Sequence, residues 1–355
     1  MKAKAIVLVN FSNQLDTNIP LLTEIRQNER LRRLASCRLQ LVPIATALAQ
    51  HGIETYAISA KSPPHGGNEI FKEVKLLIVG KVTVNTEKAE RCQRTVMWYL
   101  HMARRIGIST TTIYSNHHLA DRGSIWKSIY EDILAHSDKI VCPTKGLSEA
   151  LARLGGGVIQ TIEDPCTVPT FEYKTIETEK PINLLWYGNT SNIEPILSKL
   201  QWLLKIRLNR RISLLLLTGK LSSDYIRRIT DAQSSMAPSW SVAYMPWTEE
   251  EHLIQLRKAH YTLLPCSKEE HSRYASHNRL LDAISGGTIP IATPIPSYQE
   301  LSEVAVLSDH IINAFMQSIQ YYDKLIAGYA RVREQKLKAY SLENITSKWR
   351  SLLLD

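Results

Sequence analysis

The segment 263–287 concentrates side chains that could bind a phosphate and a ribose. A predicted strand ends in it at Pro265, a polar loop follows, and a predicted helix starts near Ser276. Open α/β sheets bind ligands beyond the carboxyl ends of their strands, and a helix N-terminus there offers N–H groups and positive potential to a phosphate. Arg279 could add charge-assisted hydrogen bonds, and the carboxylate of Asp282, one turn further, suits a ribose diol. A simple alternative is a helix capped by Ser276, with Arg279 and Asp282 paired on its surface.

Two loop lysines could reach the same ligand. Lys220 follows a predicted strand that ends at Thr218, where it could contact a base or a phosphate. Lys268 lies in the polar loop before the helix, where it could neutralise a leaving diphosphate. Plain solvation is the alternative for a loop lysine, and for Lys220 it is the one we favour.

The elements that must position these residues alternate between short apolar strands and amphipathic helices, which is typical of βαβ units and parallel sheets. In the first half of the chain the predicted strands are Ala5–Val9, Thr55–Ser59, Lys75–Val79, Thr111–Tyr114 and Lys139–Val141, and the predicted helices are Leu39–Gln50, Glu87–Ile106 and Ser124–Ala135. The stretch Thr161–Lys180 lacks periodicity and contains Pro165 and Pro169, so it is predicted to be an interdomain linker.

The pattern restarts after this linker. The predicted strands are Ile182–Tyr187, Arg211–Thr218, Ser241–Met245, Tyr261–Pro265 and Ile289–Ala292, and the predicted helices are Glu194–Leu208, Asp224–Gln233, Glu249–Ala259, Ser276–Ser285 and the amphipathic tail Ser341–Leu354. A chain of 355 residues exceeds the size that one hydrophobic core usually supports. We therefore expect an α/β protein with an N-terminal domain over residues 1–165, a C-terminal domain over 181–338 and a closing helix in 339–355.

Composition excludes several classes of protein. No apolar run approaches the roughly 20 residues that cross a bilayer, and the apolar N-terminal stretch is too brief for a signal peptide. The five cysteines lack CxxC spacing and the eleven histidines form no HExxH pattern, which favours reduced thiols, a cytoplasmic protein and no zinc site. No GxGxxG follows the first predicted strand, so a Rossmann dehydrogenase is the least favoured class.

The chain carries a net charge of +9, and the basic excess leans towards its N-terminal half. The local cluster there consists of Arg26, Arg30, Arg32, Arg33 and Arg38. A basic surface of this kind attracts phosphorylated lipids, anionic membranes or nucleic acid. An ordinary solvated helix face is an equal alternative.

Several segments, in order along the chain, resemble family 4 glycosyltransferases. Asn278–Gly287 with the following Ile289–Leu301 resembles the donor-site helix and strand of that family. Further resemblances lie in Ser137–Ser148, Leu184–Asn192 and Tyr340–Leu354. The resemblance implies the GT-B fold, in which two Rossmann-like domains with parallel sheets face a central cleft and a C-terminal helix crosses back to the N-terminal lobe. It also implies a retaining hexosyltransferase that uses a nucleotide diphosphate sugar, UDP- or GDP-linked, as donor and needs no cofactor.

The resemblance also suggests roles for residues of the C-terminal half. Asp282 stands where the family has the glutamate that binds the nucleotide ribose. Eight residues earlier, where the family has a glutamate that touches the donor sugar, this sequence has Tyr274, a departure for which Glu269 or Glu270 could compensate. Asn278 and the backbone around Ser276 and His277 are expected to face the diphosphate. Gly188, Asn189 and Asn192 lie where the first loop of the family's second domain approaches it.

In the N-terminal half the family places a histidine that reaches the donor sugar. His117 and His118 follow a predicted strand, so either is a candidate catalytic residue, although adjacent histidines at a strand end are equally often surface residues. Asp121, Arg122 and Arg38 are the candidate acceptor-binding residues. No Asp-x-Asp motif is present, so the sequence requires no metal ion.

The predicted function is therefore transfer of a sugar from a nucleotide diphosphate sugar to an acceptor hydroxyl on a saccharide or a lipid-linked glycan. Two alternatives remain open. One is a glycosyltransferase that acts on modified bases of DNA, for which the basic N-terminal lobe would follow phosphates. The other is a non-catalytic GT-B protein, which would account for Tyr274.

Overall fold

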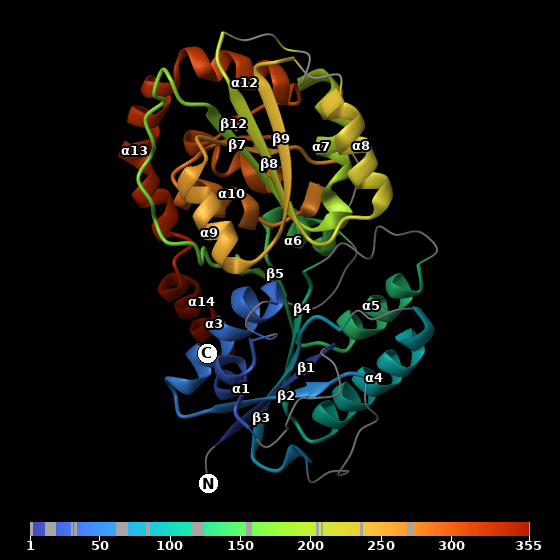
Figure 1. Cartoon of the computed structure of the whole chain (residues 1–355). Coiled ribbons are helices and arrows are strands. Elements are labelled where there is room, and N and C mark those ends of the chain that lie inside the picture. The colour runs from blue at the N-terminus through green and yellow to red at the C-terminus, as the bar shows by residue number, and fades with distance from the viewer. Residues whose placement is uncertain are drawn as a thin grey trace. The chain divides into compact units, whose positions relative to one another are not determined.

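The computed structural model of the protein describes residues 3–10, 19–29, 31, 34–61, 70–82, 86–115, 124–153, 158–203, 206, 209–234, 237–267 and 273–354. The chain divides into two compact units. The first contains Met1–Pro165, Tyr274–Ser276 and Tyr340–Asp355, and the second contains Cys166–Arg273 and His277–Ala339. Each unit is built around one six-stranded sheet (Figure 1).

The sheet of the first unit has the strand order β2-β1-β3-β4-β5-β6, and all of its neighbouring strands are parallel. The strands are β1 (Lys4–Val9), β2 (Glu54–Ser59), β3 (Val74–Val79), β4 (Ser109–Ile113), β5 (Lys139–Cys142) and β6 (Val158–Thr161). The helical segments are α1 (Leu21–Gln27), the π-helical turn η1 (Cys37–Leu41), α3 (Val42–Ala49), η3 (Thr86–Lys88), α4 (Ala89–Arg105), α5 (Ile125–Ala135), α6 (Lys145–Ala152) and α14 (Leu342–Leu354).

Alternation along the strands explains why both faces of this sheet are covered. In β1, Ile6 and Leu8 join the apolar cluster that includes α4, α5 and α6. Val7 and its neighbours at positions 5 and 9 join the cluster that includes α1, α3 and α14. Successive strand side chains point to opposite faces, so the continuous apolar run of β1 requires helices on both sides.

The C-terminal helix α14 packs in the first unit, as expected from the sequence. Ile345, Trp349 and Leu353 are buried in the cluster that contains α1 and α3. The ammonium of Lys139 donates to the carbonyl of Leu352 at 2.5 Å, which satisfies one of the last carbonyl groups of the helix. In Figure 1, α14 lies beside α3 on the side of the sheet away from α4 and α5.

The sheet of the second unit has the order β12-β11-β10-β7-β8-β9 and is likewise parallel. The strands are β7 (Ile182–Tyr187), β8 (Ile212–Thr218), β9 (Trp240–Pro246), β10 (Tyr261–Leu264), β11 (Ile289–Ala292) and β12 (Val306–Leu307). The helical segments are η5 (Thr190–Asn192), α7 (Glu194–Leu203), α8 (Ser223–Ser234), α9 (Glu249–Lys258), α10 (Asn278–Ser285), α11 (Pro296–Gln299), η7 (Ser302–Val304), α12 (Ile311–Gln320) and α13 (Tyr322–Lys338). Figure 1 shows α7 and α8 on one side of this sheet and α9, α10 and α13 on the other.

The structure contains several elements that are absent from the sequence-based expectations. Strand β6 and helices α6, α12 and α13 are not among the predicted elements. In β6 no side chain is fully buried, and only three residues of the 17-residue α13 are buried, so neither segment shows a strong apolar pattern. The predicted helix Leu39–Gln50 is divided between η1 and α3. Among the described residues, no helix is both long and apolar enough to span a membrane.

Candidate active site

The carboxyl edge of the second sheet brings together residues from three neighbouring strands and one helix. Gly188 follows β7, Gly219 follows β8, and Cys266 lies two residues beyond the end of β10. Helix α10 begins at Asn278, two residues later than expected, and no side-chain hydrogen bond caps its start. Because β7 is the neighbour of both β8 and β10, these residues and α10 belong to the middle of the sheet edge, where open α/β folds bind ligands.

Arg279, in the first turn of α10, contributes its own positively charged guanidinium to this edge of the sheet. Its Nη2 donates to the Sγ atom of Cys266 at 3.8 Å, whereas its buried Nη1 has no hydrogen-bond partner in the part of the chain that the structure describes. Burial by itself lowers the pKa of Arg279, but Tyr298 and Cys266 more than offset this, and the pKa is raised above its ordinary range. The guanidinium is therefore charged at every physiological pH and retains an unused donor.

Gly188 lies directly against this guanidinium. A Cβ atom at position 188 would be 3.4 Å from Nη1 of Arg279, so a side chain there would occupy the space in front of the donor. Thr218 donates a hydrogen bond to the carbonyl of Gly188 at 2.7 Å and so ties the ends of β7 and β8 together. A Cβ at Gly219 would lie 3.0 Å from Oγ1 of Thr190. The two glycines thus keep this edge open to a ligand and allow its loops to approach closely.

Tyr187 and Asp282 lie on the protein side of the same cluster. The hydroxyl of Tyr187 donates to the main-chain carbonyl of Arg279 at 2.5 Å and so fixes the first turn of α10. Burial, together with the charge of Asp282, raises the pKa of Tyr187 well above its ordinary value. The same two causes raise the pKa of Cys166 to about 12. Asp282 is half-buried and lies one turn beyond Arg279 on the same helix.

The remaining predicted residues of this edge are exposed. Asn189, Asn192 and Lys220 all face solvent. The side chain of Asn189 accepts a hydrogen bond from the N–H group of Ser191 at 3.2 Å and so caps the short helix η5. The structure therefore places these three exposed residues on the segments that follow β7 and β8.

The side chain of His277 is buried, and the expected role of this residue concerns only its backbone. Its side chain is only 1% exposed, and its Nε2 lies 3.3 Å from a carboxylate oxygen of Glu300. Only its main chain, at the N-cap of α10, is therefore placed to face a ligand. The neighbouring residues Tyr274 and Ser276 group with the first unit, and Tyr274 packs against the apolar cluster of α4 and α5.

Several predicted residues lie outside the described part of the chain. They are His117, His118, Asp121, Arg122 and Lys268, together with Glu269 and Glu270. Arg38 is described and belongs to the π-helical turn η1 of the first unit. Burial raises the pKa of Cys37 to about 12, with the nearby Glu24 adding to the effect and Arg38 opposing it. Arg38 is half-buried, and its charge acts on the neighbouring Cys37.

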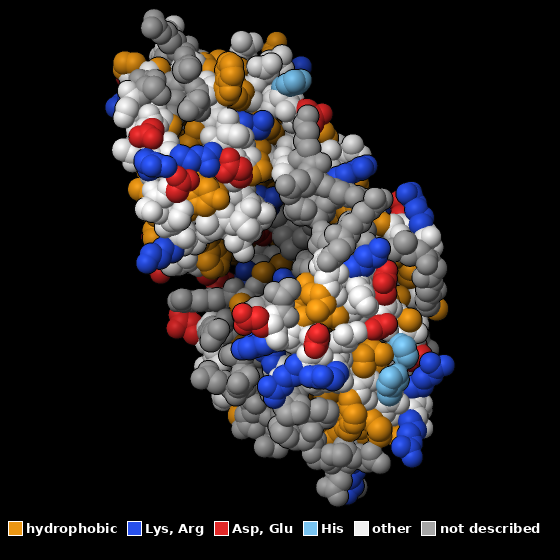
Figure 2. Space-filling view, turned by 90° about the vertical axis from the view of Figure 1, so that its right-hand side faces the viewer, with side chains coloured by type: hydrophobic (Ala, Val, Ile, Leu, Met, Phe, Trp, Pro, Cys, Tyr) orange, Lys and Arg blue, Asp and Glu red, His pale blue; other side chains and the backbone are white. Residues whose placement is uncertain are grey.

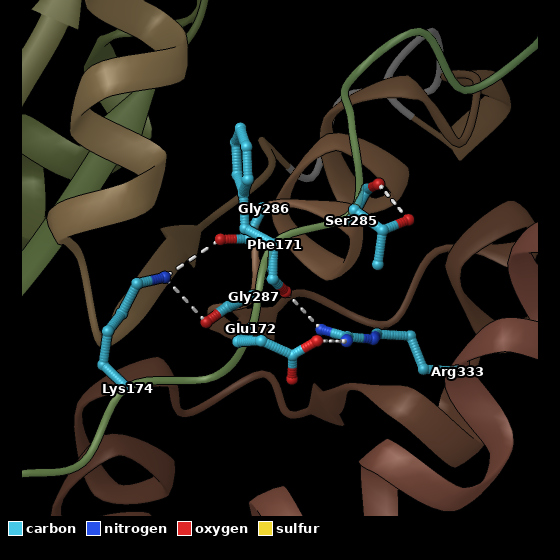
Figure 3. Close-up of polar contacts among 8 residues, drawn as sticks. Phe171, Glu172, Lys174, Ser285, Gly286, Gly287 and Arg333 are labelled. Atoms are coloured by element: carbon cyan, nitrogen blue, oxygen red, sulfur yellow. Dashed lines mark hydrogen bonds and ion pairs between the residues drawn. The ribbon is translucent and has the colours of Figure 1, made fainter.

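The far end of α10 is held by the connecting segment Cys166–Lys180, which has no helix or strand of its own. The ammonium of Lys174 donates to the carbonyls of Gly286 and Gly287, each at 3.0 Å (Figure 3). It also donates to the carbonyl of Leu256 at 3.0 Å, and so caps the ends of α9 and α10 together. Burial, and then the charge of Arg333, lowers the pKa of Lys174 to about 8.

Further contacts fix the same segment. The N–H group of Phe171 donates to the carbonyl of Ser285 at 2.7 Å, and Arg333 of α13 donates to the carbonyl of Phe171 at 2.7 Å (Figure 3). The guanidinium of Arg333 also lies over the ring of Tyr173, 4.5 Å from its centroid. The C-terminal end of α10 is therefore tied to α9 and α13 through a segment that the sequence marks only as a linker.

Sequence reasoning missed the residues that surround Arg279. Cys266, Tyr187 and the fully buried Tyr298 lie in three separate elements, and burial raises the pKa of Tyr298 to about 12. Each reads as an ordinary core residue in the sequence. The only available signal was position, because Cys266 and Tyr187 come at the carboxyl ends of predicted strands.

No cluster of three or more histidine, cysteine, aspartate or glutamate side chains that could hold a metal ion occurs among the described residues. The five cysteines are all free thiols.

Comparisons with known proteins find relatives only among solved structures. No protein-family model matches the sequence, and no curated protein matches it. HepE from Anabaena, solved in complex with UDP, is 11% identical, with a TM-score of 0.63 and a match that covers 99% of each chain. An alpha-glucosyltransferase solved with UDP-glucose and DNA containing an abasic site is 12% identical, with a TM-score of 0.61 and 99% of each chain covered.

A chain of the GtfA/B complex is also similar. It is 14% identical, with a TM-score of 0.52, and the match covers 79% of this chain and 56% of that one. At such low identity the likeness shows the fold. Together with the two parallel sheets, it confirms the two-domain GT-B architecture with Rossmann-like halves that was expected from the sequence.

Proposed function

We propose that this protein is a glycosyltransferase that uses a nucleotide diphosphate sugar as donor. The observation that carries the proposal is the buried Nη1 of Arg279, a charged donor without a described partner beside Gly188 at the carboxyl edge of the second sheet. Leaving a buried guanidinium donor unpaired costs free energy, and a diphosphate would satisfy it. The solved structures of HepE with UDP and of the alpha-glucosyltransferase with UDP-glucose support this assignment.

In this proposal the donor lies over the N-terminus of α10. Arg279 binds the diphosphate together with the main-chain groups of Ser276, His277 and Asn278. The carboxylate of Asp282 accepts hydrogen bonds from the two hydroxyl groups of the ribose. The loops that carry Gly188, Asn189, Asn192 and Lys220 close over the phosphates or the base, with Lys268 as a further cation. UDP and GDP are the nucleotides that we favour.

The proposed reaction breaks the bond between the anomeric carbon and the diphosphate oxygen, and a bond to the acceptor oxygen forms on the same face of the sugar. Because the new bond forms on the same face, the anomeric configuration is retained, as in family 4 enzymes. The acceptor proton passes to the leaving phosphate. Arg279 and the start of α10 stabilise the negative charge that develops on the leaving group. His117 or His118 is the proposed contact to the donor sugar, and Tyr274 replaces a carboxylate there.

Calorimetric titration with UDP, GDP, ADP and dTDP tests the donor site. We expect one nucleotide to bind wild type, and Asp282→Ala and Arg279→Met to weaken that binding by about tenfold to a hundredfold, the usual worth of a charged hydrogen bond. Arg227→Met is the matched control, because Arg227 is exposed on α8 and, among the residues that the structure describes, pairs only with Asp224, at 2.6 Å. If none of the four nucleotides binds, the donor site and the proposed activity are wrong.

Saccharide or lipid-linked acceptors are the first candidates, and DNA is the second. The observation that favours DNA is the set of exposed arginines on α4, which have no ion-pair partner among the described residues: Arg91, Arg94, Arg104 and Arg105. Duplex binding that falls steeply with salt would favour DNA over a saccharide. For Arg38, Asp121 and Arg122, a role in acceptor binding remains a proposal.

A further inference from the structure

Two arginines of α8 show how a guanidinium is ordinarily paired in this protein. Arg227 lies 2.6 Å from a carboxylate oxygen of Asp224, and Arg228 lies 2.7 Å from one of Glu194. The face in Figure 2 likewise shows Lys and Arg side chains interspersed with Asp and Glu side chains. A carboxylate beside a guanidinium offsets its charge and repels a phosphate, so arginines paired in this way are unsuited to bind an anion.

Arg279 of α10 has a neutral partner instead. Its Nη2 donates to the Sγ atom of Cys266 at 3.8 Å, and it forms no ion pair with any carboxylate that the structure describes. Burial raises the pKa of the Cys266 thiol, and the charge of Arg279 opposes this only in part. The thiol therefore stays protonated at physiological pH, and the guanidinium keeps its full charge.

The thiol is fixed by contacts on either side of the residue. The N–H group of Cys266 donates to Oγ1 of Thr293, just beyond β11, at 3.0 Å. Its Sγ also donates to the carbonyl of Leu264 at 4.0 Å. A thiol can donate to this carbonyl while it accepts from Arg279, whereas a thiolate could only accept. The contacts thus agree with a neutral thiol held at the end of β10.

Arg279 is held at its main chain as well, which leaves one donor for a ligand. The hydroxyl of Tyr187 donates to the carbonyl of Arg279 at 2.5 Å. The buried Nη1 has no partner in the described chain, and it lies 3.4 Å from where a Cβ of residue 188 would be. An arginine side chain has several rotatable bonds, so fixing it before a ligand arrives reduces the entropy lost on binding.

We propose that Cys266 is the residue that positions Arg279 for the diphosphate of the donor. Its sulfur fixes Nη2 without offsetting the charge of the guanidinium, so Nη1 meets the ligand with that charge intact. An acidic residue at position 266 would fix the same side chain but would occupy it as an ion pair. The identity of the ligand rests on the proposed glycosyltransferase function, whereas the contact between Cys266 and Arg279 does not.

The test is a calorimetric titration of the full chain with UDP and with inorganic pyrophosphate. We expect Cys266→Asp to weaken the binding of both probes by about a hundredfold or more, because its carboxylate pairs with Arg279 and repels the phosphates. Cys266→Asn has the same shape without the charge and should stay within about tenfold of wild type. Cys266→Ala should lose about threefold to tenfold, the usual worth of a neutral hydrogen bond.

Cys166→Ala is the matched control for the alanine variant. Cys166 is also half-buried and also contacts α10, but its thiol donates to the carbonyls of Val168 and Leu281, each at 3.8 Å. This variant should bind both probes as wild type does. Thermal unfolding of every variant checks that the second unit is folded under the conditions of the titration.

The outcomes separate this inference from the donor proposal. Equal losses in Cys266→Asp and Cys266→Asn would mean that position 266 only supports the fold, and would overturn the positioning role even if wild type binds UDP. If wild type binds pyrophosphate but no nucleotide, and Cys266→Asp alone abolishes that binding, the positioning role stands and the proposed function fails. If wild type binds neither pyrophosphate nor any nucleotide, both proposals are wrong.

Discussion

Gly52 and Gly287 show that the backbone conformation and the surrounding space can each require a glycine at a single position. Gly52 follows α3 with a φ of +70°, and Gly287 follows α10 with a φ of +67°. Both conformations are unfavourable for residues with a Cβ atom. Their surroundings differ, because a Cβ at Gly52 would meet nothing within 4 Å, whereas one at Gly287 would lie 2.5 Å from the carbonyl oxygen of Glu172.

This contrast predicts a difference between two otherwise equal substitutions. We expect Gly52→Ala to cost about 1 kcal/mol through its backbone conformation. Gly287→Ala should cost about 3 kcal/mol, since the connecting segment must also move out of contact. Thermal unfolding of both variants measures the difference. Equal shifts in the two variants would mean that the connecting segment yields without cost.

Arg279 shows why residue type alone does not identify a site. From the sequence, Arg279 and Asp282 could be either two ligand-binding residues or a surface ion pair. In the structure its donors are directed towards Cys266 and Gly188, and Asp282 acts instead on Tyr187 and Cys166. Burial is what turns an ordinary arginine into a site for an anion, because an unpaired buried donor is costly.

At the scale of elements, α10 is held firmly at its C-terminal end. Lys174 donates hydrogen bonds to the carbonyls that end α10 and to the carbonyl of Leu256 in α9. Arg333 binds the carbonyl of Phe171 and so holds the connecting segment against α10. Rigid support of this kind keeps Arg279 and Asp282 in place without any ligand, which reduces the entropy lost on binding.

The capping lysine predicts a dependence of stability on pH. Its pKa is lowered to about 8, first by burial and then by Arg333 and Arg257, whereas an unfolded lysine titrates near 10.4. Between these values the unfolded chain binds more protons, so the contribution of Lys174 to stability rises with pH through this window. The slope is at most about 1.4 kcal/mol for each pH unit.

The measurement is the difference in unfolding free energy between wild type and Lys174→Met, followed from pH 7 to pH 10. Taking the difference removes the tyrosines and cysteines that titrate in the same range. We expect wild type to gain stability relative to the variant as the pH rises. A constant or shrinking difference would show that Lys174 titrates like an exposed lysine.

At the scale of the whole molecule, the last helix belongs to the unit in which the chain began. Trp349 of α14 is 2% exposed in a cluster with α1 and α3, and Lys348 pairs with Glu163 at 2.6 Å. The first unit therefore lacks part of its core until the end of the chain has been made. Each unit nevertheless has its own sheet and apolar clusters.

Truncation of that tryptophan should therefore affect the two units differently. We expect Trp349→Ala to destabilise the first unit by about 3–5 kcal/mol, because it leaves a large cavity in a core that is otherwise closed. The unfolding transition that responds to nucleotide should stay unchanged. Arg350→Ala, an exposed neighbour on the same helix, is the control and should change stability by less than about 0.5 kcal/mol. Calorimetric scans with and without UDP separate the transitions.

The sequence by itself determined the alternation of strands and helices and the parallel sheets, whereas the return of the last helix was implied by the resemblance to family 4 glycosyltransferases. The alternation and the sheets depend on apolar periodicity and on helix stops such as His51-Gly52, which are local properties of the chain. It also marked the segment around Arg279 and Asp282, because a polar loop between a buried strand and a helix is visible in one dimension. Weakly periodic elements such as β6 and α13 were missed for the same reason.

Only the tertiary structure decided which side chains serve the site. It buried His277 against Glu300, surrounded Arg279 with Cys266 and Tyr298, and tied the linker to α10 through Lys174. These contacts join residues far apart in the chain, and their strength depends on burial, which no local pattern encodes.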